Sequence, residues 1–199
     1  MKHPLRLGVL GSGKGSNFRA IMEEIVGNRL DAEVRIVISD VENSGILSLA
    51  RDFQVPGLYV RPGRFRTRLE PEIEEDIVRR LLEADVELVV LAGFMRIVKQ
   101  PLLSAFPRKI INIHPSLLPK FRGLEAWKQA LAAGEKVAGC TVHYVDAEVD
   151  AGEILGKETV PILSDDTPES LHARIQVSEH RLLPAVIAGI AEKYQSPEA

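Results

Sequence analysis

The stretch that decides the fold is Lys109-Ile-Ile-Asn-Ile-His-Pro-Ser-Leu-Leu-Pro-Lys-Phe-Arg-Gly123. It begins with three β-branched isoleucines, which fit a buried pleated surface and predict a strand. Side chains alternate between the two faces of a strand, so Asn112 and His114 point to the same side. Pro115 ends the strand because it has no N–H group for the hydrogen-bond ladder. An amide and an imidazole are therefore presented together at the carboxyl end of a strand.

That end of a strand is where ligands bind in open α/β sheets. Asparagine can donate a hydrogen bond to a developing oxyanion, and histidine can donate or shuttle a proton. The alternative is that Asn112 and His114 only tie down the proline-rich loop that follows them. The segment alone favours this structural interpretation. A functional interpretation needs further motifs elsewhere in the chain.

On either side of this segment, apolar strands alternate with amphipathic helices. Such alternation predicts an α/β fold with a doubly wound, mostly parallel sheet. After Gly123 the pattern changes to two strands close together, which predicts a late antiparallel addition. We expect strands at 5–10, 34–38, 57–60, 88–92, 110–114, 138–145 and 154–160, and helices at 16–26, 44–53, 65–84 (starting near 67 or later), 124–133 and 168–193.

Length and composition exclude several classes of protein. With 199 residues, 45% apolar and 27% charged, the chain predicts a single globular domain, 1–199. A net charge of −3 gives no support for nucleic-acid binding. The single cysteine, Cys140, excludes an intrachain disulfide and argues against a cysteine-based metal site. No signal region is visible, and no apolar run reaches the roughly 20 residues that span a membrane, so we expect a soluble, cytoplasmic protein.

A glycine-rich turn, Gly11-Ser-Gly-Lys-Gly15, joins the first strand to the first helix. A helix N-terminus carries free N–H groups and a partial positive charge, and glycine lets a phosphate approach the backbone. Gly15, Ser16 and Asn17 stand at that N-terminus. The turn fits neither the dinucleotide fingerprint, which needs glycine in place of Ser16, nor the triphosphatase loop, which needs Ser or Thr in place of Gly15. It predicts either a phosphate site of another kind or a plain tight turn.

An acidic loop, Asp146-Ala-Glu-Val-Asp-Ala-Gly152, joins the last two strands. Its spacing does not match an EF-hand calcium loop. A solvated acidic turn and a catalytic element both remain open, and the loop alone favours the first. His143 and Tyr144 on the adjoining strand favour the second, although we expect His143 itself to be a packed strand residue rather than a catalyst.

Four motifs follow one another along nearly the whole chain: Gly13-Lys-Gly-Ser-Asn17, Ala92-Gly-Phe-Met-Arg-Ile97, Asn112-Ile-His-Pro-Ser-Leu-Leu-Pro119 and Asp146-x-x-x-Asp-x-Gly152. Together they resemble the phosphoribosylglycinamide formyltransferase family, folate-dependent enzymes of purine synthesis. The third motif is highly specific for formyltransferase-type folate enzymes, and the Gly-Ser-Asn loop narrows the resemblance to the glycinamide ribonucleotide branch. The resemblance implies a Rossmann-like formyltransferase fold, with a phosphate-binding half at about 1–100 and a catalytic, folate-binding half at about 101–199.

The resemblance implies transfer of the formyl group of 10-formyltetrahydrofolate, a co-substrate, to the amine of N1-(5-phospho-D-ribosyl)glycinamide in purine (IMP) biosynthesis, without a metal. Asn112, His114 and Asp150 would be catalytic during direct attack by the amine. Asp150 would favour the imidazolium form of His114, since an opposite charge stabilises the charged state. The residues implied to bind the ribonucleotide are Gly15, Ser16, Asn17, Gln176, Val177, Ser178 and Glu179. Those implied to bind the folate are Arg68, Met95, Arg96, Ile97, Val98, Asn112, Asp146, Ala147, Glu148, Val149 and Asp150, with 95–98 using backbone groups around the pterin.

Two other functions remain as alternatives. A formyltetrahydrofolate hydrolase would share the Asn-x-His-Pro motif, but such relatives usually carry an N-terminal regulatory domain, for which the first five residues leave no room. A non-catalytic folate or nucleotide sensor would not need Asn112, His114 and Asp150 together. One departure from the family, Leu124-Glu-Ala-Trp127 in place of a histidine pair, affects only local loop contacts. The expected partners are the two small-molecule substrates, with no nucleic acid or membrane, and the chain is expected to be a monomer or a homodimer.

Overall fold

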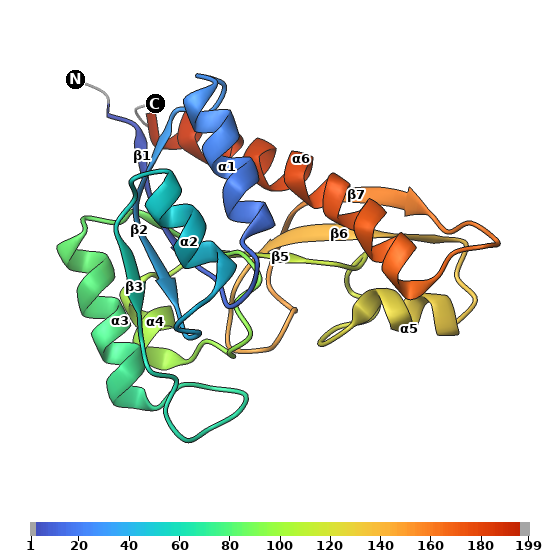
Figure 1. The fold of residues 1–199 in the computed structure, drawn as a ribbon, viewed down its shortest axis with the longest axis horizontal. Helices are drawn as coiled ribbons and strands as arrows, with labels where there is room; N and C mark the ends of the chain where they lie inside the picture. Colours follow the sequence, from blue (N-terminus) through green and yellow to red (C-terminus); the bar gives the residue numbers. More distant parts are fainter. Residues whose placement is uncertain (1–2, 196–199) are drawn as a thin grey trace.

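The structure is a computed structural model and describes residues 3–195. Its strands form one seven-stranded sheet in the order β3-β2-β1-β4-β5-β6-β7 (Figure 1). The first five strands run parallel, and β6 and β7 pair antiparallel to their neighbours, which confirms the predicted sheet and its late addition. The strands are β1 (Leu5–Leu10), β2 (Ala32–Ser39), β3 (Gly57–Tyr59), β4 (Leu88–Leu91), β5 (Ile110–His114), β6 (Val137–Tyr144) and β7 (Ile154–Pro161), and the helices are α1 (Ser16–Val26), α2 (Gly45–Asp52), α3 (Pro71–Glu83), α4 (Gln100–Ala105), α5 (Ala126–Ala132) and α6 (Pro168–Gln195).

The predicted helices differ from the structure in two places. The helix expected at 65–84, starting near 67 or later, begins at Pro71, and Glu70 before it is extended, as a residue preceding proline prefers to be. Arg68 lies in a parallel β-bridge with Ile97 instead. Helix α4 was not expected, because six residues are too few to show a periodic apolar stripe. The other predicted bounds agree closely with the structure.

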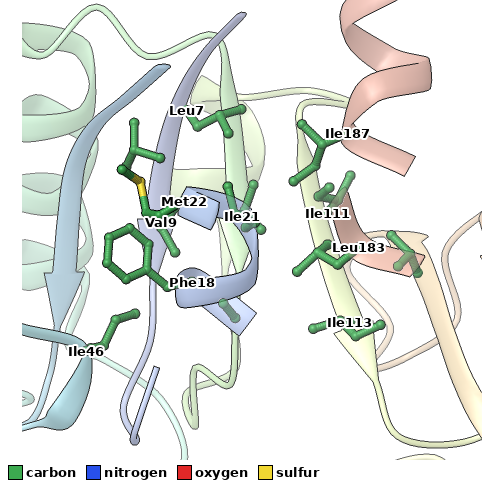
Figure 2. Close-up of a cluster of buried hydrophobic side chains, with 14 of the residues drawn as sticks. Leu7, Val9, Phe18, Ile21, Met22, Ile46, Ile111, Ile113, Leu183 and Ile187 are labelled. Carbon is green, nitrogen blue, oxygen red and sulfur yellow. The ribbon is translucent and has the colours of Figure 1, made fainter. Parts of the chain in front are cut away.

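Two buried apolar clusters cover the two faces of the sheet. Because side chains alternate along a strand, the neighbours Val9 and Leu10 enter different clusters. One cluster includes residues of α1, α2 and α6, and Figure 2 shows part of this cluster. The other cluster includes residues of α3 and α4. Burial on both faces explains why β4 is a continuous apolar run.

The order of the strands places a crevice at one edge of the sheet. The order runs β1-β2-β3 outward in one direction and β4-β5 in the other, so the topology reverses between β1 and β4. In doubly wound sheets, ligands bind outside the carboxyl ends of the strands at such a reversal. The glycine turn after β1, the segment after β4 and the loop after β5 all leave the sheet at this edge.

Candidate active site

A cavity of about 580 Å³ opens at this edge of the sheet. It is lined by the loops after β1, β4 and β6, by the end of β5 and by one side of α6. The fold therefore brings together segments that lie far apart in the sequence. The predicted site residues in its lining are Gly15, Ser16, Asn17, Met95, Arg96, Ile97, Val98, Asn112, His114, Asp146, Glu148, Val149, Asp150, Gln176 and Glu179.

Two of the four predicted residues on α6 line the cavity. Gln176 and Glu179 line the cavity, whereas Val177 and Ser178 do not. Val177 is 54% exposed and Ser178 is buried, with its hydroxyl beside the Arg181 guanidinium. A helix turns by about 100° per residue, so positions i and i+3 share a face and the two between them point elsewhere.

Two predicted folate contacts also lie outside the cavity lining. Ala147 is exposed on its loop. Arg68 is held by its β-bridge to Ile97, and its guanidinium carbon lies 4.3 Å from the centre of the Phe65 ring in a cation–π contact. The expected folate contacts of Ala147 and Arg68 therefore have no support from the cavity geometry.

Asn112, His114 and Asp150 meet at the centre of the cavity. Asp150 Oδ2 lies 3.4 Å from His114 Nδ1, and Asp150 Oδ1 lies 3.5 Å from Asn112 Nδ2. Oδ2 also accepts a hydrogen bond of 2.9 Å from the Gly123 N–H group. Asp150 has a φ of 52°, a left-handed conformation that is uncommon outside glycine and recurs at functional sites. An amide, an imidazole and a carboxylate from separate segments are thus held within reach of one another.

His143 belongs to this cluster, although the sequence indicated only a packed strand residue. It is buried, and it lies directly opposite Asn112 in the pairing of β5 with β6. Its Nδ1 donates to the Tyr144 carbonyl over 2.8 Å, so Nε2 accepts from Asn112 when the ring is neutral and donates to Asp150 when the ring is protonated. That Nε2 lies 3.2 Å from Asn112 Nδ2 and 3.6 Å from Asp150 Oδ1. His143 therefore fixes the Asn112 amide with its N–H groups toward the cluster.

The ionisation states in this cluster follow from burial and from the contacts. Burial lowers the pKa of His114 below its ordinary value, and the Phe121 carbonyl and the charge of Asp150 raise it without offsetting the burial. Burial raises the pKa of Asp150, but the contacts with His143, His114 and the Gly123 N–H outweigh it, so the net pKa is lowered. The charge of Asp150 favours the imidazolium form of His114, as expected. Because the net His114 pKa is still lowered, the resting His114 ring is neutral near pH 7.

The proton of neutral His114 can be assigned from the same contacts. Nε2 lies 2.9 Å from the Phe121 carbonyl oxygen, which can only accept, so Nε2 carries the proton. Nδ1, which faces Asp150, is then free to accept one. The pair is built to take up a proton at Nδ1 and to stabilise it with the carboxylate.

A second polar pair lies where α1 meets α6. Asn17 Nδ2 donates to Glu179 Oε2 over 3.0 Å, and both residues are buried. Burial raises the pKa of Glu179 to about 7, against the opposing effect of the Asn17 hydrogen bond. Among the described residues, Asn17 Oδ1 has no hydrogen-bond partner. A buried acceptor without a partner suits a ligand that carries a hydroxyl or an amine donor.

Replacing Glu179 with glutamine should change how stability depends on pH. The wild-type pKa rises from 4.5 in the unfolded chain to about 7 in the folded chain, so stability falls as pH rises through this window. We expect a fall on the order of 3 kcal/mol from this group. Chemical denaturation below and above the window measures it. Glu179→Gln should show a smaller fall than the wild type, and an identical pH dependence would contradict the assignment.

Three further residues in the cavity lining, Lys14, Trp127 and His172, were not predicted. The rings of Trp127 and His172 are stacked, with centroids 3.8 Å apart and an interplanar angle of 2°. Burial and the neighbouring charge of Lys14 lower the pKa of His172. The sequence carried no signal for this stack, because it joins residues of α5 and α6 that only the tertiary fold brings together.

Comparison with known proteins places these features in context. The family model described as Formyl transferase matches residues 5–187. Phosphoribosylglycinamide formyltransferase of Bacillus subtilis (strain 168) is 40% identical over 182 residues, which cover 92% of this chain and 92% of that protein. The trifunctional purine biosynthetic protein adenosine-3 of Homo sapiens is 38% identical over 190 residues, which cover 96% of this chain but 19% of that protein.

Solved structures give the same result. Glycinamide ribonucleotide transformylase 1 from Symbiobacterium toebii superposes with a TM-score of 0.92 at 45% identity, covering 100% of this chain and 93% of that one. Phosphoribosylglycinamide formyltransferase from Bacillus halodurans gives a TM-score of 0.89 at 38% identity, covering 96% and 97%. The first of these similarities covers the whole chain and so includes every segment that lines the cavity.

Proposed function

Because this chain belongs to the formyl transferase family, we propose that it transfers the formyl group of 10-formyltetrahydrofolate to the amine of N1-(5-phospho-D-ribosyl)glycinamide in purine biosynthesis. The observation that carries this proposal is one cavity that holds both an amide–imidazole–carboxylate cluster and a glycine loop at a helix N-terminus. The cluster suits acyl transfer to an amine, and the loop suits the phosphate of the acceptor.

The phosphate of the acceptor binds at the N-terminus of α1 in this proposal. Gly15 is the N-cap of α1 with a φ of 80°, and Ser16 and Asn17 begin the helix. Free N–H groups and the helix dipole favour an anion there. Gln176 and Glu179 face the same space from α6 and contact the rest of the acceptor.

The folate binds between the segment after β4 and the loop after β6. Met95, Arg96, Ile97 and Val98 line the cavity from the first segment, and Asp146 to Asp150, except Ala147, line it from the second. A pterin ring is flat and carries donors and acceptors on its edge, which backbone groups of these segments can satisfy. A folate held there presents its formyl group to Asn112, which lies between the two segments.

The chemistry then follows from the contacts. The acceptor amine attacks the formyl carbon, a C–N bond forms, and the bond from that carbon to the folate nitrogen breaks. Asn112 Nδ2 donates to the oxyanion that develops on the formyl oxygen. The attacking amine loses a proton and the folate nitrogen gains one. His114 Nδ1 takes part in this transfer while Asp150 stabilises the imidazolium, directly or through a relaying water.

One contact restricts the part that His114 plays. Its Nε2–H is bound to the Phe121 carbonyl, so this N–H reaches the formyl oxygen only if the loop after β5 releases it. Asn112 Nδ2 also has partners, but its contact with Asp150 Oδ1, at 3.5 Å, is much weaker than the 2.9 Å bond of His114. The formyl oxygen can replace that weak contact, so Asn112 is the principal oxyanion donor in this arrangement and His114 acts mainly on the proton.

Alanine at Gly15 should weaken binding of the acceptor more than binding of the folate. Gly15 has a φ of 80°, and a β-carbon there would lie 2.8 Å from the Ile46 α-carbon, so the loop has to shift. We expect the dissociation constant of the acceptor to rise by about tenfold, which corresponds to the usual cost of a left-handed non-glycine residue. Calorimetry with each ligand alone measures the two affinities.

The matched comparison for this variant is Gly13→Ala in the same loop, because a β-carbon at Gly13 would meet nothing within 4 Å. This variant adds the same methyl group without moving the backbone, so it should have a smaller effect. Equal losses of acceptor and folate affinity in Gly15→Ala would count against a phosphate site at the loop.

One assay distinguishes the proposed function from its alternatives: formyl transfer to the acceptor, with formate release measured in parallel. We expect transfer that depends on the acceptor, with little formate released. Rapid formate release without the acceptor would identify a hydrolase. Binding of either ligand without turnover would identify a sensor.

We further propose that 1–199 acts as one domain, with the phosphate loop in the half at about 1–100 and the chemistry and most folate contacts in the half at about 101–199. Within residues 3–195, no helix is long and apolar enough to cross a membrane. We place the chain in the cytoplasm as a monomer or homodimer with two small-molecule substrates. Fractionation and ultracentrifugation test the compartment and the oligomeric state.

A further inference from the structure

A buried ion pair connects the glycine loop to the segment after β4. Asp40 directly follows β2, its side chain is 2% exposed, and its Oδ2 accepts a hydrogen bond of 2.6 Å from Arg96 Nε. Its Oδ1 accepts a hydrogen bond of 2.5 Å from Ser12 Oγ. Ser12 Oγ in turn accepts the Met95 N–H over 2.9 Å. One carboxylate thus holds a residue from each of two loops that line the cavity.

The Arg96 side chain points away from the cavity's ligand space and into the protein. It is 16% exposed, and Nη1 donates to the Phe65 carbonyl over 2.8 Å and also to the Arg66 carbonyl. The backbone of the same region is joined to the glycine loop by a bond of 3.0 Å from the Ser12 N–H to the Gly93 carbonyl. The folate contact expected of Arg96 is therefore confined to its backbone.

We propose that Asp40 is a positioning residue, which fixes the glycine loop against the segment after β4 and so sets the distance between the two bound substrates. This inference rests on the proposed function, in which the loop holds the phosphate of the acceptor and the segment holds the pterin. Transfer requires the amine and the formyl carbon to lie about 3–3.5 Å apart, and a shift of about 1 Å costs roughly 100-fold in rate.

A carboxylate is the group that this position requires. An ionised carboxylate is an acceptor at both oxygens, which matches two donors, Arg96 Nε and Ser12 Oγ. Asparagine has the same shape but only one acceptor oxygen, so one of the two donors would lose its partner. It also leaves the Arg96 charge buried without a counter-ion. Either effect lets the loop and the segment move apart.

The variant that tests this is Asp40→Asn. We expect turnover to fall by about 100-fold. The dissociation constants of the acceptor and of a folate analogue, each measured alone, should change far less, because each subsite stays intact and only their separation changes. A defect in folding alone would instead lower the active fraction, which titration with a tight-binding folate analogue counts.

The chain offers a matched control in Asp166. Its side chain is also 2% exposed and also pairs with an arginine, Arg174, at 2.5 Å, but neither residue lines the cavity. Asp166→Asn should therefore destabilise the fold and leave turnover per active site unchanged. A second control uses Ser12: Ser12→Thr keeps the hydroxyl and should keep most of the turnover, whereas Ser12→Ala should lose it in part.

The possible outcomes distinguish a failure of this inference from a failure of the proposed function. If the wild type is active and Asp40→Asn has unchanged turnover, this inference is overturned and the proposed function is not. Equal losses of turnover per active site in Asp40→Asn and Asp166→Asn would also overturn this inference. So would an Asp40→Asn variant that loses only affinity for the folate analogue. A wild type that transfers no formyl group would overturn the proposed function, and this inference with it.

Discussion

An Asp150→Asn enzyme is expected to turn over about a thousandfold more slowly than the wild type while binding the acceptor almost unchanged. Asp150 Oδ2 faces His114 Nδ1 at 3.4 Å, and the acceptor site that we propose at Gly15 to Asn17 belongs to another segment. Asparagine keeps the shape of the side chain but removes its charge. Nδ1 then takes up a proton with no carboxylate to stabilise it, so the loss falls on the chemical step rather than on binding.

The same substitution should be visible in the titration of His114. The charge of Asp150 is one of the influences that raise the His114 pKa against burial. Without it the pKa should fall further below its ordinary value, which histidine NMR measures directly. A large loss of turnover with an unchanged His114 titration would mean that Asp150 works by another route.

Aspartate at Asn112 should be more damaging than alanine at the same position. Asn112→Ala removes the oxyanion donor that we propose, and losing such a donor typically costs about 100–1,000-fold in turnover. Asn112→Asp removes the donor and also places a carboxylate about where Nδ2 lies, 3.5 Å from Asp150 Oδ1 and beside the developing oxyanion. Repulsion between these charges adds to the lost hydrogen bond, so we expect a loss greater than about 1,000-fold near neutral pH.

Turnover as a function of pH separates the two variants. A protonated carboxyl regains an O–H donor and loses its negative charge, so Asn112→Asp should recover part of its activity, relative to Asn112→Ala, as pH falls. The neighbouring Asp150 raises the pKa of the new carboxyl and brings this recovery closer to neutral pH. Equal losses in the two variants at every pH would contradict the charge argument.

The central strand shows what could be predicted from sequence. Strand alternation and Pro115 are local properties, and they placed Asn112 and His114 together at the carboxyl edge of a parallel sheet, where the structure has them. His143 was missed because its contact with Asn112 depends on the register of β6 against β5, which is set by tertiary packing rather than by local pattern. The resemblance to a family named Asp150, but nothing local in the acidic loop distinguished it from Asp146.

Side-chain direction was the other property that the sequence did not carry. The resemblance implied a folate contact through the backbone around Arg96 but carried nothing about its guanidinium, which turns inward to Asp40, a residue 56 positions away in the chain. Of the four predicted positions on α6, helical geometry places Gln176 and Glu179 in the cavity lining and directs Val177 and Ser178 elsewhere. In both cases the residues were placed on the right element, and the face was decided by partners that lie elsewhere in the sequence.

We propose that His114 and Asp150, 3.4 Å apart, act as one unit on the proton that the amine gives up. Turnover of the double variant His114→Asn, Asp150→Asn, measured beside each single variant, tests that claim most directly. Residues that act as a unit are not additive, so the double variant should be hardly slower than the slower of the two single variants. A double loss equal to the product of the two single losses would show that the two residues act independently.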